Sequence, residues 1–155
     1  MASIGAAYSV VVPTRSNAAT TEVAVLWVSN PAGSGVTSRA HSLYVAPDGL
    51  STNEEIIIRL YRNPTVTSNG TAATINSSRP RKAVTSKMLA YTLPTTSSNG
   101  TKIAEFYATT AFALMEDSLS LFFDQGQSLL ITVQQSSNGI NYTTDLTWRE
   151  PIDPA

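Results

Sequence analysis

Ile140-Asn-Tyr-Thr-Thr-Asp-Leu-Thr-Trp-Arg149 is the most regular stretch of this sequence, because apolar and polar residues alternate along it. In an extended chain, one face would carry Ile140, Tyr142, Thr144, Leu146 and Trp148. The opposite face would carry Asn141, Thr143, Asp145, Thr147 and Arg149. Successive side chains of a β-strand point to opposite faces of its sheet. The stretch therefore predicts a strand with one face in a core and the other in solvent or in an interface.

Similar short stretches recur through the chain, separated by clusters of Gly, Pro, Asn and Ser. The stretches that we expect to be strands are 22–28, 41–46, 55–62, 87–93, 102–109, 118–123, 128–135 and 140–149, with 8–12 as a candidate ninth. Residues 110–117 fit either a helical turn or a connecting strand. Short strands with regular turn signals are typical of sandwiches and barrels. We expect an all-β fold, a jelly-roll-like β-sandwich of about eight strands, with an immunoglobulin-like sandwich as the alternative.

The stretch Glu22-Val-Ala-Val-Leu-Trp-Val28 differs from the others because it is apolar on both faces. A strand with one face in solvent would show polar residues at every second position. We therefore expect both faces to be covered, either within the domain or by a partner that contacts Trp27.

Three turns share the tripeptide Ser-Asn-Gly, at 68–70, 98–100 and 137–139. Asn-Gly pairs tolerate the left-handed conformations that tight hairpins need. We interpret them as three similar turns and not as a solenoid repeat.

The length of 155 residues suits a single domain. We expect residues 1–19 to form an N-terminal arm or first strand, residues 20–150 to form the sandwich, and residues 151–155 to form a tail. The N-terminal residues lack the basic opening of a signal peptide, because the first basic residue is Arg15.

Composition argues against several classes of protein. Charged residues make up 14% of the chain and the net charge is −1, so no bulk field attracts nucleic acid or an anionic membrane. No apolar run reaches the roughly 18 residues of a membrane helix. There is no Cys and one His, so we expect neither a metal site nor a cofactor.

The sequence offers little for catalysis. His41 is the lone histidine, and no Gly-x-Ser-x-Gly elbow accompanies it. Glu54-Glu55 and Glu116-Asp117 are adjacent acids, which point to opposite faces of a strand. We expect that the protein is not an enzyme.

The distribution of charge along the chain is uneven. Residues 56–104 contain no acid and seven bases, whereas residues 105–155 have a net charge of −6. The densest basic cluster is Arg79-Pro-Arg-Lys82. Arg79, Arg81 and Lys82 are candidate contacts to an acidic partner or a neighbouring subunit, together with Trp27 and with Arg15 of the arm. The cluster lacks the interleaved aromatic residues that stack on nucleic-acid bases.

Two segments carry a resemblance to a known group of proteins. One is Leu60-Tyr-Arg-Asn-Pro-Thr-Val-Thr-Ser-Asn-Gly-Thr71 and its continuation to Asn76; the other is Gln125-Gly-Gln-Ser-Leu-Leu-Ile-Thr-Val133, followed by Leu146-Thr-Trp-Arg-Glu150. Over about residues 20–150 the chain resembles small β-sandwich virion proteins of tailed bacteriophages, of the capsid decoration (cement) type.

This resemblance implies a structural protein without catalytic residues. Its partners would be the major capsid protein and copies of itself, expected as a homotrimer. It would be made in the bacterial host cytoplasm and would sit on the capsid exterior, where it would stabilise the head. The alternative is a receptor- or carbohydrate-binding module of a tail or head fibre, which would use exposed rings among Trp27, Tyr61, Tyr91, Tyr107, Tyr142 and Trp148.

Overall fold

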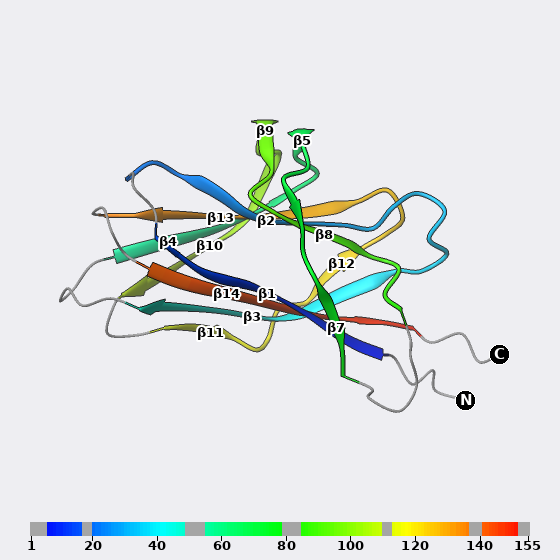
Figure 1. The fold of residues 1–155 in the computed structure, drawn as a ribbon. Helices are drawn as coiled ribbons and strands as arrows, with labels where there is room; N and C mark the ends of the chain where they lie inside the picture. Colours follow the sequence, from blue (N-terminus) through cyan, green and yellow to red (C-terminus); the bar gives the residue numbers. More distant parts are fainter. Residues whose placement is uncertain are drawn as a thin grey trace.

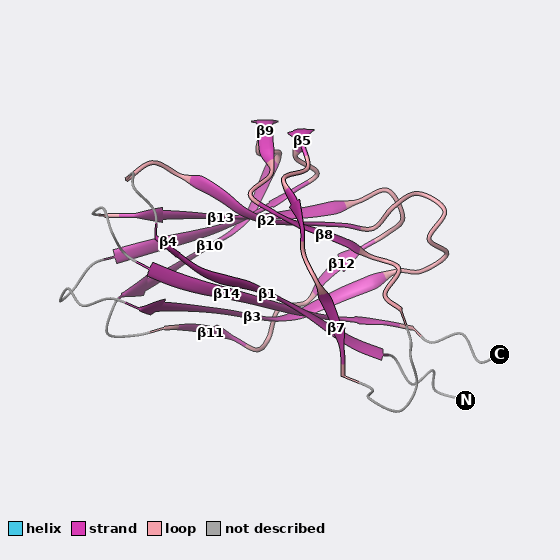
Figure 2. Cartoon of the chain, in the orientation of Figure 1, coloured by secondary structure: helices cyan, strands magenta, loops and turns pink. Residues whose placement is uncertain are grey.

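The computed structural model describes residues 6–16, 20–48, 55–78, 85–109, 113–136 and 141–151. Strands and loops make up this part of the chain, and none of its residues lies in a helix (Figure 2). The strands form two stacked sheets and a small ribbon that rises above one of them (Figure 1). The predicted all-β sandwich is therefore confirmed.

Among the described residues there is no helix of the length and apolar character needed to cross a membrane.

The first sheet, sheet A, is antiparallel and has β14 at its centre. Its strand order is β11 (Leu114–Glu116), β3 (Ser38–Asp48), β14 (Asn141–Glu150), β1 (Ala6–Ser16) and β7 (Ile75–Ser77), and β12 (Leu121–Phe123) also pairs with β3. The alternation predicted for 140–149 is present in β14, where Tyr142, Leu146 and Trp148 are buried and Arg149 is exposed. The ambiguous segment 110–117 contains strand β11, so in its described part the connecting strand is correct and the helical turn is wrong.

The second sheet, sheet B, has the order β10 (Thr101–Thr109), β4 (Glu55–Arg62), β13 (Ser128–Gln135), β2 (Val23–Ser29), β8 (Leu89–Thr92) and β6 (Thr71–Ala72). The ribbon pairs β5 (Thr65–Ser68) with β9 (Thr95–Ser98). The described residues thus form fourteen strand segments, more than the eight expected. Each expected stretch forms one strand, β1 corresponds to the candidate ninth, and the additional short strands β5, β6, β7, β9 and β11 lie in segments between the expected ones.

The core lies between the facing sides of the two sheets. Sheet A contributes Val10, Leu43, Leu146 and Trp148, and sheet B contributes Ile56, Ile58, Leu60, Leu129, Ile131 and Val133. All of these side chains are almost completely buried. Each large aliphatic or aromatic side chain buried in this way contributes roughly 1.5–3 kcal/mol to folding. The outer faces of both sheets are left for other contacts.

Sheet B has an approximate two-fold symmetry, with its axis between the central strands β13 and β2. The symmetry relates β4 to β8 and β10 to β6. The strand register agrees with it, because one row of paired residues crosses the whole sheet as Lys102, Tyr61, Leu130, Trp27, Tyr91 and Ala72. Tyr61 and Tyr91 are therefore equivalent positions, and the chain leaves the sheet at the same place in each half.

Candidate interaction surfaces

Beyond these two tyrosines the chain forms a pair of loops that we call the projection, residues 63–70 and 93–100. It contains the ribbon β5–β9 and rises above sheet B (Figure 1). None of its residues is charged, and most of them are exposed. Its surface consists largely of Ser, Thr and Asn side chains, which can exchange hydrogen bonds with a partner without removing a charge from water.

The backbone of the projection is tightly constrained. Asn63 and Leu93 begin its two halves, and both have a φ of 52°. Gly70 and Gly100 end the two halves with φ values of 78° and 86°. Such positive φ values are uncommon for residues with a Cβ atom. The two loops therefore repeat one conformation, in keeping with the symmetry of sheet B.

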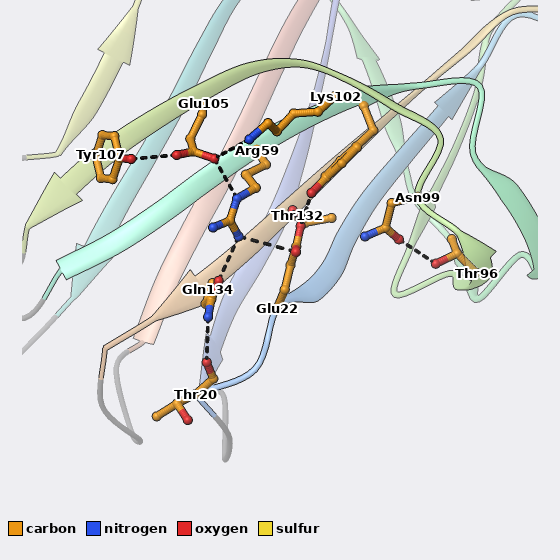
Figure 3. Close-up of polar contacts among 11 residues, drawn as sticks. Thr20, Glu22, Arg59, Thr96, Asn99, Lys102, Glu105, Tyr107, Thr132 and Gln134 are labelled. Carbon is orange, nitrogen blue, oxygen red and sulfur yellow. Dashed lines mark hydrogen bonds and ion pairs between the residues drawn. The ribbon is translucent and has the colours of Figure 1, made fainter.

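Hydrogen bonds tie the projection to itself and to the sheet. The hydroxyl of Thr67 donates to the carbonyl oxygen of Thr95 at 3.1 Å, and the hydroxyl of Thr96 donates to Asn99 Oδ1 at 2.8 Å (Figure 3). The amides of Asn63 and Leu93 donate to backbone oxygens of β13 and β2, at 3.0 and 3.2 Å. The projection is thus built as a stiff element and not as an open loop.

Aromatic side chains lie on the outer face of sheet B between the two halves of the projection. Trp27 stacks on Tyr91, with ring centroids 5.4 Å apart and planes inclined by 25°. Leu130, their neighbour in the same row, is fully buried. Trp27, predicted as a partner contact, is half-buried, and one face of its ring packs against Tyr91. The apolar outer face of 22–28 is therefore covered in part by the chain itself.

A polar network covers the neighbouring part of the same face. Arg59 lies at its centre, where Nε donates to Glu105 at 2.8 Å and Nη1 lies 3.4 Å from Glu22 (Figure 3). Glu22 also accepts hydrogen bonds from the hydroxyls of Tyr61 and Thr132. The network holds the chain where it enters β2 against strands β4, β10 and β13.

Glu105 has the most perturbed carboxyl group of this network. Hydrogen bonds from Tyr107, Arg59 and Lys102, at 2.6, 2.8 and 3.0 Å, lower the pKa of Glu105 to about 2. The hydrogen bond between Tyr107 and Glu105 also raises the pKa of Tyr107. Because these acids and bases are paired with one another across strands, the network holds its strands together.

The structure describes little of the other residues predicted as partner contacts. Arg79, Arg81 and Lys82 lie outside the described residues. The backbone of Arg15 pairs with Tyr142 at the end of β1, and its side chain also lies outside what the structure describes.

The residues on either side of the basic cluster are anchored at one end of sheet A. The amide of Ser78 donates to the carbonyl oxygen of Ala7 at 3.0 Å. After the cluster, the hydroxyl of Ser86 and the amide of Lys87 donate to the buried carboxylate of Glu150. The described residues that flank the cluster therefore contact two neighbouring strands, β1 and β14.

The lone histidine lies at a bulge in β3. Burial lowers the pKa of His41, and the charges of Arg149 and Arg39 lower it further. Its buried Nδ1 has no hydrogen-bond partner among the described residues, so no carboxylate orients the ring as a catalytic triad requires. Within the same residues, no three acidic or histidine side chains gather as they would around a metal ion.

The symmetric relation of the two loops was missed from the sequence. Residues 61–71 and 91–101 both read Tyr-x-x-Pro-Thr-x-x-Ser-Asn-Gly-Thr, so two of the three Ser-Asn-Gly turns belong to a repeat of eleven residues. The residues that precede each Ser-Asn-Gly turn could have revealed this repeat, because Tyr61 and Pro64 of one half match Tyr91 and Pro94 of the other. The structure pairs the two copies with each other instead of stacking them in series.

No known protein-family model matches this sequence, and comparison with curated proteins gives no match either.

Proposed function

We propose that this chain is a structural virion protein of a tailed bacteriophage, a capsid decoration (cement) protein that binds the outer surface of the major capsid protein lattice. Its role would be adhesive and not enzymatic, with its place on the capsid exterior. The observation that carries the proposal is the projection: a stiff, uncharged double loop that stands clear of the sandwich (Figure 1).

The sequence resemblance also supports the projection as the capsid-binding surface. The motif that most resembles these virion proteins is Asn63-Pro-Thr-Val-Thr-Ser-Asn-Gly-Thr71, and it contains one half of the projection, residues 63–70. The second half repeats it. A rigid loop pair loses little conformational entropy when it docks, so more of its contact free energy is available for binding.

The alternative, a receptor- or carbohydrate-binding module, would need open aromatic ring faces. Of the six rings considered for this role, Trp148 and Tyr142 are buried, and Trp27 and Tyr91 stack on each other. Tyr107 alone is mostly exposed, at 60%. These positions favour the capsid partner over a sugar.

The proposal is tested by adding purified protein to capsids that lack it. We expect saturable, stoichiometric binding and greater resistance of the capsids to heat. The double variant Ser68→Asp/Ser97→Asp places a negative charge on each half of the projection, at exposed positions, and should bind at least tenfold more weakly.

A matched control is the double variant Ser118→Asp/Ser120→Asp, which also adds two negative charges, at exposed serines outside the projection, and should bind like the wild type. Absence of binding by the folded wild-type protein to any capsid form would contradict the proposal. Binding to a glycan array without binding to capsids would favour the alternative module.

A further inference from the structure

The outer face of sheet A carries two rows of side chains with matching chemistry. The strand register places the first row as Ala7, Arg149, Arg39 and Phe122, on β1, β14, β3 and β12. It places the second row as Val11, Asp145, Tyr44 and Met115, on β1, β14, β3 and β11. Arg149 and Asp145 are four residues apart on β14, about 13 Å along a strand.

The second row contains a carboxylate whose hydrogen bonding is incomplete. Asp145 Oδ1 is buried, and it has no hydrogen-bond partner among the described residues. Burial raises the pKa of Asp145. A buried acceptor without a donor costs the folded chain free energy. Asp145 as a whole is only partly buried, so a cation of a partner can approach its side chain from the outer face of the sheet.

The first row contains two cations without an acid. Arg149 and Arg39 are exposed cross-strand neighbours, and neither forms an ion pair within the described residues. Like charges directly opposite each other on a sheet are destabilising. Arg39 also lies over the ring of Phe122, with its guanidinium carbon 5.5 Å from the ring centre.

Apolar side chains flank the charges in both rows. The exposed large ones are Val11 at 45%, Tyr44 at 40%, Met115 at 68% and Phe122 at 51%. Exposed apolar groups that gather around polar ones on a single face mark interaction surfaces. The rest of the described chain exposes Leu89 and Tyr107 in the same way, and both belong to sheet B.

A two-fold rotation brings the first row onto the second. The row midway between them is Ser9, Thr147 and Ser42. If a second copy is generated by rotation about this middle row, its Asp145 faces Arg149 of the first copy. In the same way its Tyr44 faces Arg39, its Met115 faces Phe122 and its Val11 faces Ala7. Each facing pair joins groups that attract: an ion pair, a cation over a ring, and two apolar contacts.

We propose that two copies of this chain pair face to face through the outer faces of their A sheets, about a two-fold axis along Ser9, Thr147 and Ser42, with Arg149 of each copy on Asp145 of the other. Facing sheets pack about 10 Å apart, a gap that Arg, Tyr, Met and Phe side chains fill from both sides. The pairing adds a self-association surface to the proposed function and does not depend on capsid docking.

A groove on this face fits the same arrangement. It measures about 240 Å³ and is lined by Ala7, Tyr8, Ser9, Ser77, Ser78, Asp145 and Thr147. The rotation brings Val11 of the second copy over Ala7, at the lip of the groove. A two-fold interface uses the same surface on both copies, whereas the trimer expected from the resemblance would join two different surfaces. The chemistry of this face therefore favours a dimer over that trimer.

The test uses the full chain in sedimentation velocity over a wide range of concentrations. We expect the wild type to dimerise. Asp145→Arg and Arg149→Asp each replace both intermolecular ion pairs with like-charge pairs, and each should weaken dimerisation at least a hundredfold. The double variant Ser68→Asp/Ser97→Asp makes the same change of net charge as Arg149→Asp at exposed positions of the projection, above the other sheet, and it should dimerise like the wild type.

The decisive sample is a mixture of the two single variants. Asp145→Arg supplies arginine at both positions and Arg149→Asp supplies aspartate at both, so the two should form a heterodimer although each alone is monomeric. Far-UV circular dichroism checks that each variant is folded.

Three results would overturn the proposal: a wild type that stays monomeric, a wild type that forms trimers, or folded variants that fail to combine. The capsid assay remains separate, because Arg149→Asp leaves the projection intact. Failure of dimerisation with normal capsid binding would reject the pairing alone, and the reverse would reject the capsid role alone.

Discussion

Gly70 and Gly100 face each other's loop across the two-fold axis of sheet B. A Cβ atom added to Gly70 would lie 2.1 Å from the carbonyl oxygen of Thr92, and one added to Gly100 would lie 2.3 Å from that of Arg62. Both distances are too short for any side chain, and the obstacle in each case is backbone that cannot swing away. Each glycine therefore allows one half of the projection to close against the strand that starts the other half.

Gly70→Ala and Gly100→Ala should each destabilise the protein by roughly 3 kcal/mol or more, because a positive φ and a backbone clash act together. Gly33→Ala is the matched control: φ is 82° there, but nothing lies within 4 Å of the added Cβ. Its cost should be limited to the conformational penalty of about 1 kcal/mol. Urea denaturation at neutral pH measures all three. Equal losses of unfolding free energy for Gly33→Ala and Gly70→Ala would show that the backbone at Gly70 moves away from Thr92 in solution.

Leu93→Asn should stabilise the protein. Leu93 has the same φ of 52° as its equivalent Asn63, yet asparagine tolerates this region better than leucine does. We expect a gain of about 0.5–1 kcal/mol, seen as a rise in Tm of roughly 2 °C. The reverse exchange, Asn63→Leu, should lower Tm, because it also removes the hydrogen bond from the Ser128 amide to Asn63 Oδ1. A lower Tm for Leu93→Asn would show that packing of the leucine side chain outweighs its backbone strain.

Acid should remove the contribution of Glu105 to stability. The pKa of Glu105 is about 2 in the folded chain, below its ordinary value of 4.5, because Tyr107, Arg59 and Lys102 donate to the charged form. The contribution is therefore complete above pH 4.5 and is lost as the pH falls towards 2. Glu105→Gln should be less stable than the wild type at neutral pH, and the difference should disappear near pH 2. Denaturant titrations at a series of pH values would show this, and a constant difference would contradict it.

Asp145 should have the opposite dependence on pH. Burial raises its pKa above the ordinary 3.8, so its ionised form is the one that the folded monomer disfavours. Its cost is absent below pH 3.8 and grows as the pH rises through the folded-state pKa. Asp145→Asn should therefore raise Tm at neutral pH in dilute protein, by about 2 °C if the gain is near 1 kcal/mol. The same variant should dimerise more weakly, which would separate stability from assembly; an unchanged Tm would mean that water already satisfies the carboxylate.

The sequence predicts the sandwich because burial imposes a period of two on a strand. β14 follows that pattern from Asn141 to Glu150, and β4 follows it at Ile56, Ile58 and Leu60. The segment 110–117 was ambiguous because Leu114 and Met115 suit a helix as well as a strand, and pairing with β3 decides between them. Pairing between distant strands is a property of the whole fold, which local patterns do not encode.

The surfaces were harder to predict than the core. Trp27 was expected as a contact, but its partner Tyr91 comes from a strand more than sixty residues away. Arg149 and Asp145 were visible as one polar face of β14, yet their neighbours Arg39 and Tyr44 became known only with the register of β3. A face is assembled from several strands, so its chemistry follows from topology.

The absence of charge from the projection has a practical consequence for ionic strength. Attraction between Asp145 and Arg149 of two copies would be screened by added salt over about 10 Å at 0.1 M. Hydrogen bonds from serine and threonine hydroxyls have little such sensitivity. Concentrated salt should thus weaken the proposed pairing of two copies and have little effect on the proposed docking of the projection.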